Sequence, residues 1–439
     1  MRRLAAALFA SLCALPAWSG DLLAIYRQAL ANDARIAAAR AERDAGLEKV
    51  VQGRAGLLPS VGLSGYSTWN EVDVHTVLPR QERNYNTHGY TVQLTQPLFR
   101  WQNWVQYRQG ELQGALAEAR FGEARQDLML RVAEAYFNVL NAQDALDAVT
   151  QLRTAAAEQL EIARTSFEVG TVTITDVHEA QSRHDLAVAQ EIAADNELTV
   201  RRQALAVLIG EQPGMLASLR PGVELLRPQP ENINEWVDAA ELGSYGVQAQ
   251  HLAREIAARE VQRNRAGHYP TLDLVATHGR ANSGYYTQGV DGGSRTDSST
   301  IGVQLNVPLY AGGGISSRER EAAALKIKAD ADLDTARREA ALAARQAFLG
   351  VTSGLAQVGA LEAAQVSSAS ALEANRLGYE VGVRINIDVL NAQSQLADTR
   401  QRLARARYDT LLAQLRLKAA AGTLGEEDLA QVNALLDER

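Results

Sequence analysis

The chain has 439 residues, a formal net charge of −8 and scattered basic residues, which argues against nucleic-acid binding. Apolar residues make up 46% of the sequence but aromatic residues only 5%, a balance that favours long, closely packed helices over a thick globular core. The seven histidines lack the spacing of metal ligands and no nucleophile–base pattern is found, so we expect no metal site, no cofactor and no enzyme.

Residues 1–19 have the pattern of a secretory signal peptide: two arginines, an apolar run over 4–15 and a small-x-small cleavage site at 17–19. Cys13, the only cysteine, lies in this segment, so we expect no disulfide in the mature protein. A membrane anchor and a lipidated Cys13 are the alternatives, but the run is shorter than the roughly 20 residues of a span. No other segment is expected to reach that length, so strands would make any membrane contact.

The rest of the chain is predicted to be one unit present twice. Residues 54–59 (Arg-Ala-Gly-Leu-Leu-Pro) recur as residues 265–270 (Arg-Ala-Gly-His-Tyr-Pro), and 92–99 recur as 303–310 at the same spacing. We therefore expect four segments: the signal peptide, a first repeat, a second repeat and a C-terminal tail, over 1–19, 20–230, 231–425 and 426–439. Residues 213–230, with four prolines, would link the repeats.

Each unit predicts the order helix, strand, loop, strand, long helix, turn, helix. In the first unit we expect helices over 21–57, 100–167 and 177–209 and strands over 60–69 and 90–96. The helix over 100–167 would be about 100 Å long. Polar, glycine-containing loops are expected over 70–89 and 279–299.

The predicted strands alternate apolar and polar residues, as strands between lipid and water do. A half-buried strand of a soluble sheet fits the alternation about equally well. Two hairpins supply too few strands to close a barrel, and open sheet edges are avoided, so we expect several copies to share one barrel.

The whole mature chain resembles the TolC family of outer-membrane efflux and secretion proteins. The resemblance is carried by the duplicated unit, by the strand-ending segments 96–99 (Gln-Pro-Leu-Phe) and 307–310 (Val-Pro-Leu-Tyr), and by the second tip, 378–392, followed by 421–424. It implies a mainly α protein with membrane β-strands: a homotrimer in which four strands per copy form a twelve-stranded barrel, continued by a long periplasmic α-helical barrel.

The resemblance also implies location, function and partners. The protein would lie in the outer membrane of a Gram-negative bacterium, in contact with its lipid, as the passive exit duct of a tripartite efflux pump or a type I secretion system. A periplasmic adaptor protein and an inner-membrane transporter of the ABC or RND type would be its partners. The main alternative is a periplasmic adaptor with a helical hairpin, and a periplasmic enzyme is a weaker one. The sequence does not indicate the cargo.

Each predicted tip has a glycine at a helix C-terminus, Gly170 or Gly382, and an aspartate opening the next helix, Asp176 or Asp388. The residues alone predict plain capping, with a left-handed glycine and an aspartate N-cap. In an oligomer the aspartates would also form a carboxylate ring that attracts cations.

The resemblance implies three roles at the tips. Asp388 corresponds to an aspartate ring at the periplasmic entrance, and Asn391 to a second ring position where well-known members have another aspartate. The residues of an entrance latch would be Thr175, Asp176, Tyr379 and Arg384, while Thr165 replaces a frequent glutamine. The residues that receive the adaptor would be Val169, Gly170, Thr171, Val381, Gly382 and Val383.

Overall fold

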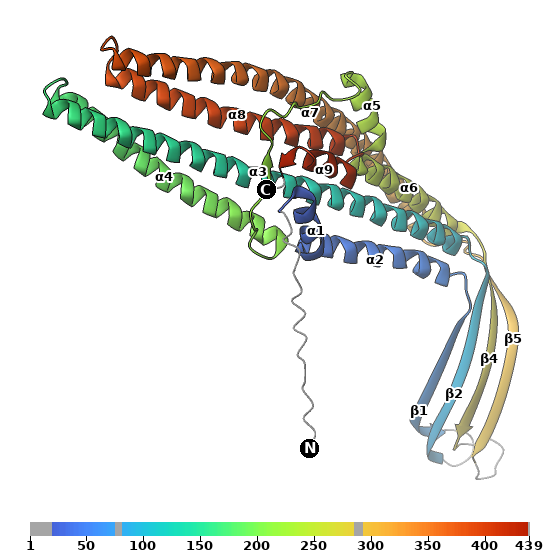
Figure 1. Ribbon diagram of the computed structural model, residues 1–439. Coiled ribbons are helices and arrows are strands. Elements are labelled where there is room, and N and C mark those ends of the chain that lie inside the picture. The colour runs from blue at the N-terminus through green and yellow to red at the C-terminus, as the bar shows by residue number, and fades with distance from the viewer. Residues whose placement is uncertain (1–19, 75–80, 285–292, 438–439) are drawn as a thin grey trace, which may run out of the picture. The chain divides into compact units, whose positions relative to one another are not determined.

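The computed structural model describes residues 20–74, 81–284 and 293–437 (Figure 1). The expected signal peptide, with Cys13, lies outside the described residues. The chain divides into two compact units. Of the described residues, those within 41–120 and 248–336 form the sheet unit, and 20–40, 121–247 and 337–437 form the helical unit. Two long helices, α3 (Trp101–Glu168) and α7 (Gly314–Glu380), contribute residues to both units.

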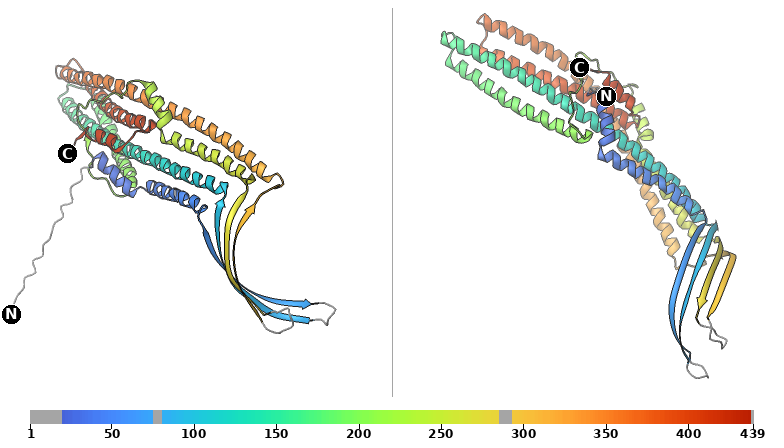
Figure 2. Two further views of the ribbon diagram at one scale, coloured as in Figure 1. Left: turned by 90° about the vertical axis from the view of Figure 1, so that its right-hand side faces the viewer. Right: turned by 60° about the horizontal axis from the view of Figure 1, so that its bottom comes forward.

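The sheet unit is built on four long, curved, antiparallel strands that lie side by side (Figure 2). They pair in the order β1 (Ser60–Val74), β2 (Gln81–Phe99), β4 (Thr271–Ser283) and β5 (Ser294–Asn306). The pairing of β2 with β4 joins the two hairpins into one sheet. The outer edges of β1 and β5 have no partner strand within the described chain.

The strands are longer than the alternation predicted. Most of 70–89 and of 279–299, expected as loops, is strand. These residues are mainly polar, but ladder hydrogen bonds use the backbone, so polar side chains can extend a strand whose faces are exposed. The loop prediction was wrong for 70–74, 81–89, 279–283 and 294–299 because it used side-chain polarity alone, and its central parts, 75–80 and 285–292, lie outside the described residues.

In the sheet unit α2 (Ala34–Ala55) and α6 (Tyr245–Arg265) lead into β1 and β4. α2 packs closely on α3, where a Cβ on Gly110 would lie 2.5 Å from the Lys49 carbonyl oxygen. Glycine permits this approach of the two backbones.

A bidentate ion pair fixes the junction between strands and helices. Arg100, between β2 and α3, donates from Nε to Asp273 Oδ1 at 2.8 Å and from Nη2 to Oδ2 at 2.6 Å. Asp273 is buried in β4, with 9% of its side chain exposed. A buried carboxylate needs such a partner, because removing it from water is costly.

The helical unit contains long antiparallel hairpins. α3 continues through a turn into α4 (Ile174–Ile209), and α7 continues into α8 (Asn386–Ala420). The predicted helix over 100–167 is confirmed as α3, with 68 residues. Smaller elements complete the unit: α1 (Leu22–Asn32), α5 (Ile233–Gly243), α9 (Glu426–Asn433), β3 (Ser218–Leu219) and β6 (Leu436–Asp437).

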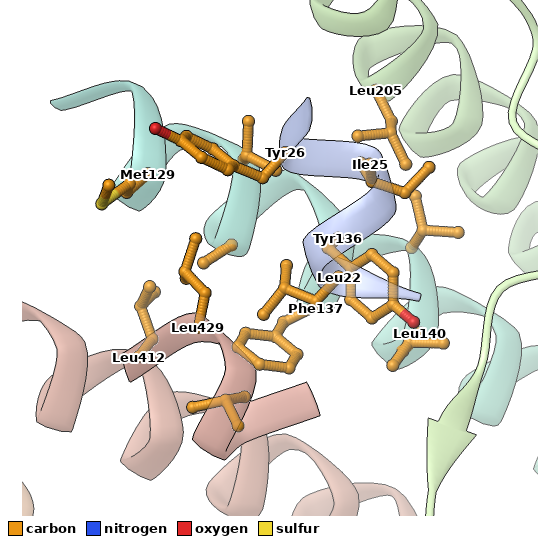
Figure 3. Close-up of a cluster of buried hydrophobic side chains, with 14 of the residues drawn as sticks. Leu22, Ile25, Tyr26, Met129, Tyr136, Phe137, Leu140, Leu205, Leu412 and Leu429 are labelled. Atoms are coloured by element: carbon orange, nitrogen blue, oxygen red, sulfur yellow. The ribbon is translucent and has the colours of Figure 1, made fainter. Parts of the chain in front are cut away.

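The main core of this unit gathers around α1 (Figure 3). α3 contributes Tyr136, Phe137 and Leu140, and further side chains come from α4, α8 and α9. The hydroxyl of the fully buried Tyr136 lies 2.8 Å from the Ala217 carbonyl oxygen and 3.0 Å from that of Gly20. Burial, strengthened by the charge of Asp21, raises the pKa of Tyr136, so the hydroxyl remains a donor.

The helix expected over 21–57 is two helices, because the chain breaks at Asp33. The backbone of Asp33 is extended, and its carboxylate accepts the Ile36 N–H at 2.9 Å. Arg131 of α3 donates to the same buried carboxylate at 2.9 Å. A local cap combined with a distant cation thus overrides helix propensity.

The expectation that no segment after residue 19 is long and apolar enough for a membrane-spanning helix was wrong. Among the described residues, α7 contains an 18-residue stretch with a mean hydropathy of 1.2, long and apolar enough to cross a membrane by length and composition alone. Only 17% of that stretch is buried within the chain.

The ion pair at the junction gives a first prediction. Arg100→Gln should lower the free energy of unfolding by about 3 kcal/mol, because the buried Asp273 carboxylate loses its cation. Urea unfolding of the detergent-solubilised protein measures the change. Arg320→Gln, an exposed arginine on α7, is the control and should have little effect. An equal loss in both variants would contradict the role of the pair.

Asp33 gives a second prediction, on pH dependence. Burial raises the pKa of Asp33, but the bonds from Arg131 and the Ile36 N–H outweigh it and hold the pKa below its usual range. The pair therefore stabilises the fold fully above the unfolded pKa of about 3.9, and its contribution is lost as the pH falls below that value.

Asp33→Asn should consequently be less stable than the natural chain at pH 7, and the difference should shrink towards pH 3. Unfolding followed by helical circular dichroism at both pH values tests this. A difference that stays constant with pH would show that the carboxylate charge is not what stabilises the break.

Candidate functional site at the helical tips

The first tip joins α3 to α4 through a left-handed glycine and a capping box. Gly170 has φ of +81°, as predicted. The N-cap is Thr173, whose hydroxyl oxygen accepts the Asp176 N–H at 3.3 Å. Asp176 accepts the Thr173 N–H in return, at 2.8 Å. The prediction of Asp176 as the N-cap was wrong, because the helix begins earlier and the aspartate is the reciprocal partner three residues on.

The second tip has the same glycine but a different helix start. Gly382 has φ of +77°, and the Val383 N–H donates to the Gly378 carbonyl oxygen at 2.8 Å. The N-cap is Ile385, which has no side-chain acceptor, so the prediction of Asp388 as N-cap was also wrong. Asp388 lies in the first turn of α8, where the helix dipole favours a negative charge.

The predicted ring aspartate has a local cation. Arg384 Nη1 lies 3.6 Å from Asp388 Oδ2, and both side chains are partly exposed, at 59% and 33%. An exposed pair of this kind contributes little to stability but offsets part of the carboxylate charge. Any ring of Asp388 side chains would therefore also be a ring of Arg384 side chains.

Three of the four predicted latch residues line one cleft. Asp176 from the first tip and Tyr379 and Arg384 from the second border a cleft of about 750 Å³. Thr175 is not among its lining residues. Within the described part of one chain, no direct hydrogen bond joins Asp176 to Tyr379 or Arg384.

The same cleft contains polar groups that sequence reasoning missed. Gln159 and Asn386 line it, and each has a buried side-chain oxygen without a hydrogen-bond partner among the described residues. Buried polar groups are nearly always satisfied, so these oxygens indicate a surface that another chain or water completes.

A further contact between the two hairpins was not predicted. Arg183 of α4 donates to the Asn391 side-chain oxygen of α8 at 3.1 Å. The two residues are 208 positions apart, so no local pattern could have indicated the contact. At the second predicted ring position the chain thus has a neutral amide bound by an arginine.

The tips also expose apolar side chains. Val169 is 71% exposed, Val381 66% and Val383 76%. All three belong to the segments predicted to receive an adaptor. Within the described ranges, no group of three His, Cys, Asp or Glu side chains could hold a metal ion.

Comparison with known proteins identifies the family. The sequence model described as outer membrane efflux protein matches residues 25–211 and 236–423. The chain is 33% identical to outer membrane protein TolC of Vibrio cholerae, with 95% of this chain and 94% of TolC covered. It is 35% identical to the alkaline protease secretion protein AprF of Pseudomonas aeruginosa, with 99% and 92% covered.

Among solved structures, the outer membrane protein VceC of Vibrio cholerae has a TM-score of 0.77 at 19% identity, with 91% of this chain and 96% of VceC covered. The fold is therefore that of the TolC-like outer-membrane channels. With two family matches that together cover most of the sequence, the chain belongs to the outer membrane efflux protein family.

Proposed function

We propose that the protein is the passive exit duct of an efflux pump or a type I secretion system, formed by three copies and opened at its tips by partners. The observation that carries this proposal is the open four-stranded sheet with an exposed apolar face. Family membership places the protein in the outer membrane as a channel rather than an enzyme.

The two faces of the sheet fit lipid on one side and water on the other. The ladder puts Val61, Leu94, Ala276 and Ile301 in one row, and Val61 and Ile301 are 68% and 75% exposed. This outer face also carries Leu63, Val92, Val303 and Leu305, whereas the opposite face carries mainly serine, threonine, glutamine and glycine. Such a division is typical of strands that line an aqueous channel in a membrane.

The open edges support an assembly. Backbone N–H and C=O groups within a bilayer must be paired, so the outer edges of β1 and β5 require partner strands. Three copies would supply twelve strands and pair every edge. The helices agree with this, because Ile192 and Val207 of α4 and Val366 of α7 are each at least 67% exposed. We assign the apolar stretch of α7 to helix packing between copies.

We further propose that residues 20–230 and 231–425 are two copies of one structural unit, with 426–439 as a tail. The order helix, strand, strand, long helix, helix occurs twice, and the family model matches twice.

At the tips we propose Asp388 and Asn391 as the entrance ring and Thr175, Asp176, Tyr379 and Arg384 as the latch. The shared cleft and the local Arg384–Asp388 pair support this proposal. The exposed valines and the unsatisfied oxygens of Gln159 and Asn386 support docking of a periplasmic adaptor, which would connect the duct to an inner-membrane ABC or RND transporter. The similarity to AprF, which is named for secretion of an alkaline protease, supports an exported cargo.

Arg384→Ser should raise single-channel conductance several-fold in a planar bilayer, because a latch without its cation would hold the entrance less tightly. The matched control is Arg405→Ser, which breaks another exposed i,i+4 arginine–aspartate pair of α8, with Asp409, at the same 3.6 Å. Unchanged conductance in Arg384→Ser would contradict the latch.

Asp388→Ala should reduce the preference for cations in reversal-potential measurements under a salt gradient, because the ring loses its carboxylates and keeps Arg384. In the natural protein we expect only a modest preference for cations, because Arg384 offsets part of the Asp388 charge. If selectivity is identical in the two proteins, Asp388 is only a favourable charge at the start of α8.

A further inference from the structure

The outer face of the sheet changes character along the strands. Towards the helices it is mainly apolar, with Val61, Leu94 and Val303, and the paired His278 and Ser299 are polar members of the row of Val92. Towards the loops the same face presents charged and polar side chains. The ladder aligns Tyr90 with Arg280 and Asp297, and the next outward-facing row aligns His88 with Asn282 and Arg295.

These polar side chains form two groups of contacts, an arginine–aspartate network and a His88–Asn282 pair. Arg280 Nε donates to Asp297 Oδ1 at 2.5 Å, and Arg295 Nε lies 3.4 Å from the other Asp297 oxygen. His88 Nε2 lies 3.3 Å from the Asn282 amide nitrogen. Asp297 therefore holds two guanidinium groups side by side, and the arginines together exceed it by one positive charge.

The network lies where an apolar membrane band would end. The segment of β2 from Tyr90, in the row of Arg280, to Phe99 is about 31 Å long at ~3.4 Å per residue. At the ~40° tilt of outer-membrane strands this covers about 23 Å of membrane thickness, close to the ~25 Å apolar band of such barrels. Trp69, 82% exposed on the same face beyond this row, fits the aromatic girdle at a membrane interface.

We propose that Arg280 and Arg295, positioned by Asp297, bind the phosphate of a glycolipid headgroup in the outer leaflet. This inference rests on the proposed duct, which puts the apolar face in lipid and the helices on the periplasmic side. Guanidinium groups match phosphate oxygens with paired N–H donors, and basic sites at the interface bind anionic headgroups. The side chains of Arg280 and Arg295 are 36% and 58% exposed, so a headgroup can reach them.

An acidic residue nearby offers a competing role for the arginines. Glu71 of β1 shares the outer face but is separated from β4 by β2. In a shared barrel, β1 of one copy would lie beside β5 of the next, where Glu71 could pair with Arg295 instead. We favour the lipid because Asp297 already satisfies the arginines partly while leaving donors on their exposed side.

The test measures binding of bisphosphorylated lipid A to the delipidated full-length assembly in detergent, by native mass spectrometry. Arg280→Gln/Arg295→Gln should weaken binding at least fivefold, whereas the control Arg320→Gln should not. Lipid A stripped of its phosphates should bind the natural protein as weakly as lipid A binds the double variant. Inorganic phosphate alone should neither bind measurably nor compete at equal concentration.

Three results would overturn the inference: unchanged lipid A binding by the double variant, equal binding of the stripped lipid, or tight binding of free phosphate. Loss of the oligomer in the double variant would assign the arginines to the seam between copies. Lipid A binding is then measured with Arg280→Gln alone, because Arg280 lies one strand away from that seam. Unchanged binding by this single variant would overturn the inference, and weaker binding would support it. Conductance of the natural protein is measured in parallel. If the natural protein does not conduct, the proposed duct is rejected. If it conducts and the double variant binds lipid A as tightly as the natural protein does, only the lipid site is rejected.

Discussion

Backbone pairing is the constraint on which this structure depends. A strand in lipid has no water to which its N–H and C=O groups can hydrogen-bond, so these groups must pair with a neighbouring strand. The β2–β4 ladder unites hairpins from distant parts of the chain, and the Arg100–Asp273 pair holds the strands where they meet the helices. The outer edges of β1 and β5 have no partner strand within the described chain, and this is the main support for the proposed assembly of several copies.

The helices have the opposite requirement. Their backbone groups are satisfied internally, but small apolar side chains on long helices need neighbours. Glycines such as Gly110 let α2 and α3 approach closely, and the cluster around α1 and Tyr136 gives the helical unit its core. Elsewhere α4 and α7 leave isoleucine and valine side chains exposed. The open sheet edges and these exposed side chains therefore both support the proposed assembly of several copies.

Charge at the tips and on the sheet is arranged in local pairs rather than in fields of one sign. Arg384 accompanies Asp388, and Asp297 joins Arg280 to Arg295. In each case the arginine is exposed enough to exchange its partner for one on another molecule. Exposed pairs of this kind can be broken at modest cost, which suits the roles proposed for them at the entrance and at the lipid headgroup.

Features that depend on short-range residue patterns could be predicted before the fold was known. Helical periodicity located α3, alternation assigned Val92 and Leu94 to the apolar face, and the left-handed turns at Gly170 and Gly382 followed from one residue each. Four features became evident only in the folded chain: the break at Asp33, the start of α4 after its N-cap Thr173, the strands over the polar residues 70–74 and 81–89, and the Arg183–Asn391 contact. Each of these depends on hydrogen bonds whose strength local residue type does not reveal, several of them to atoms far away in the chain, such as Arg131.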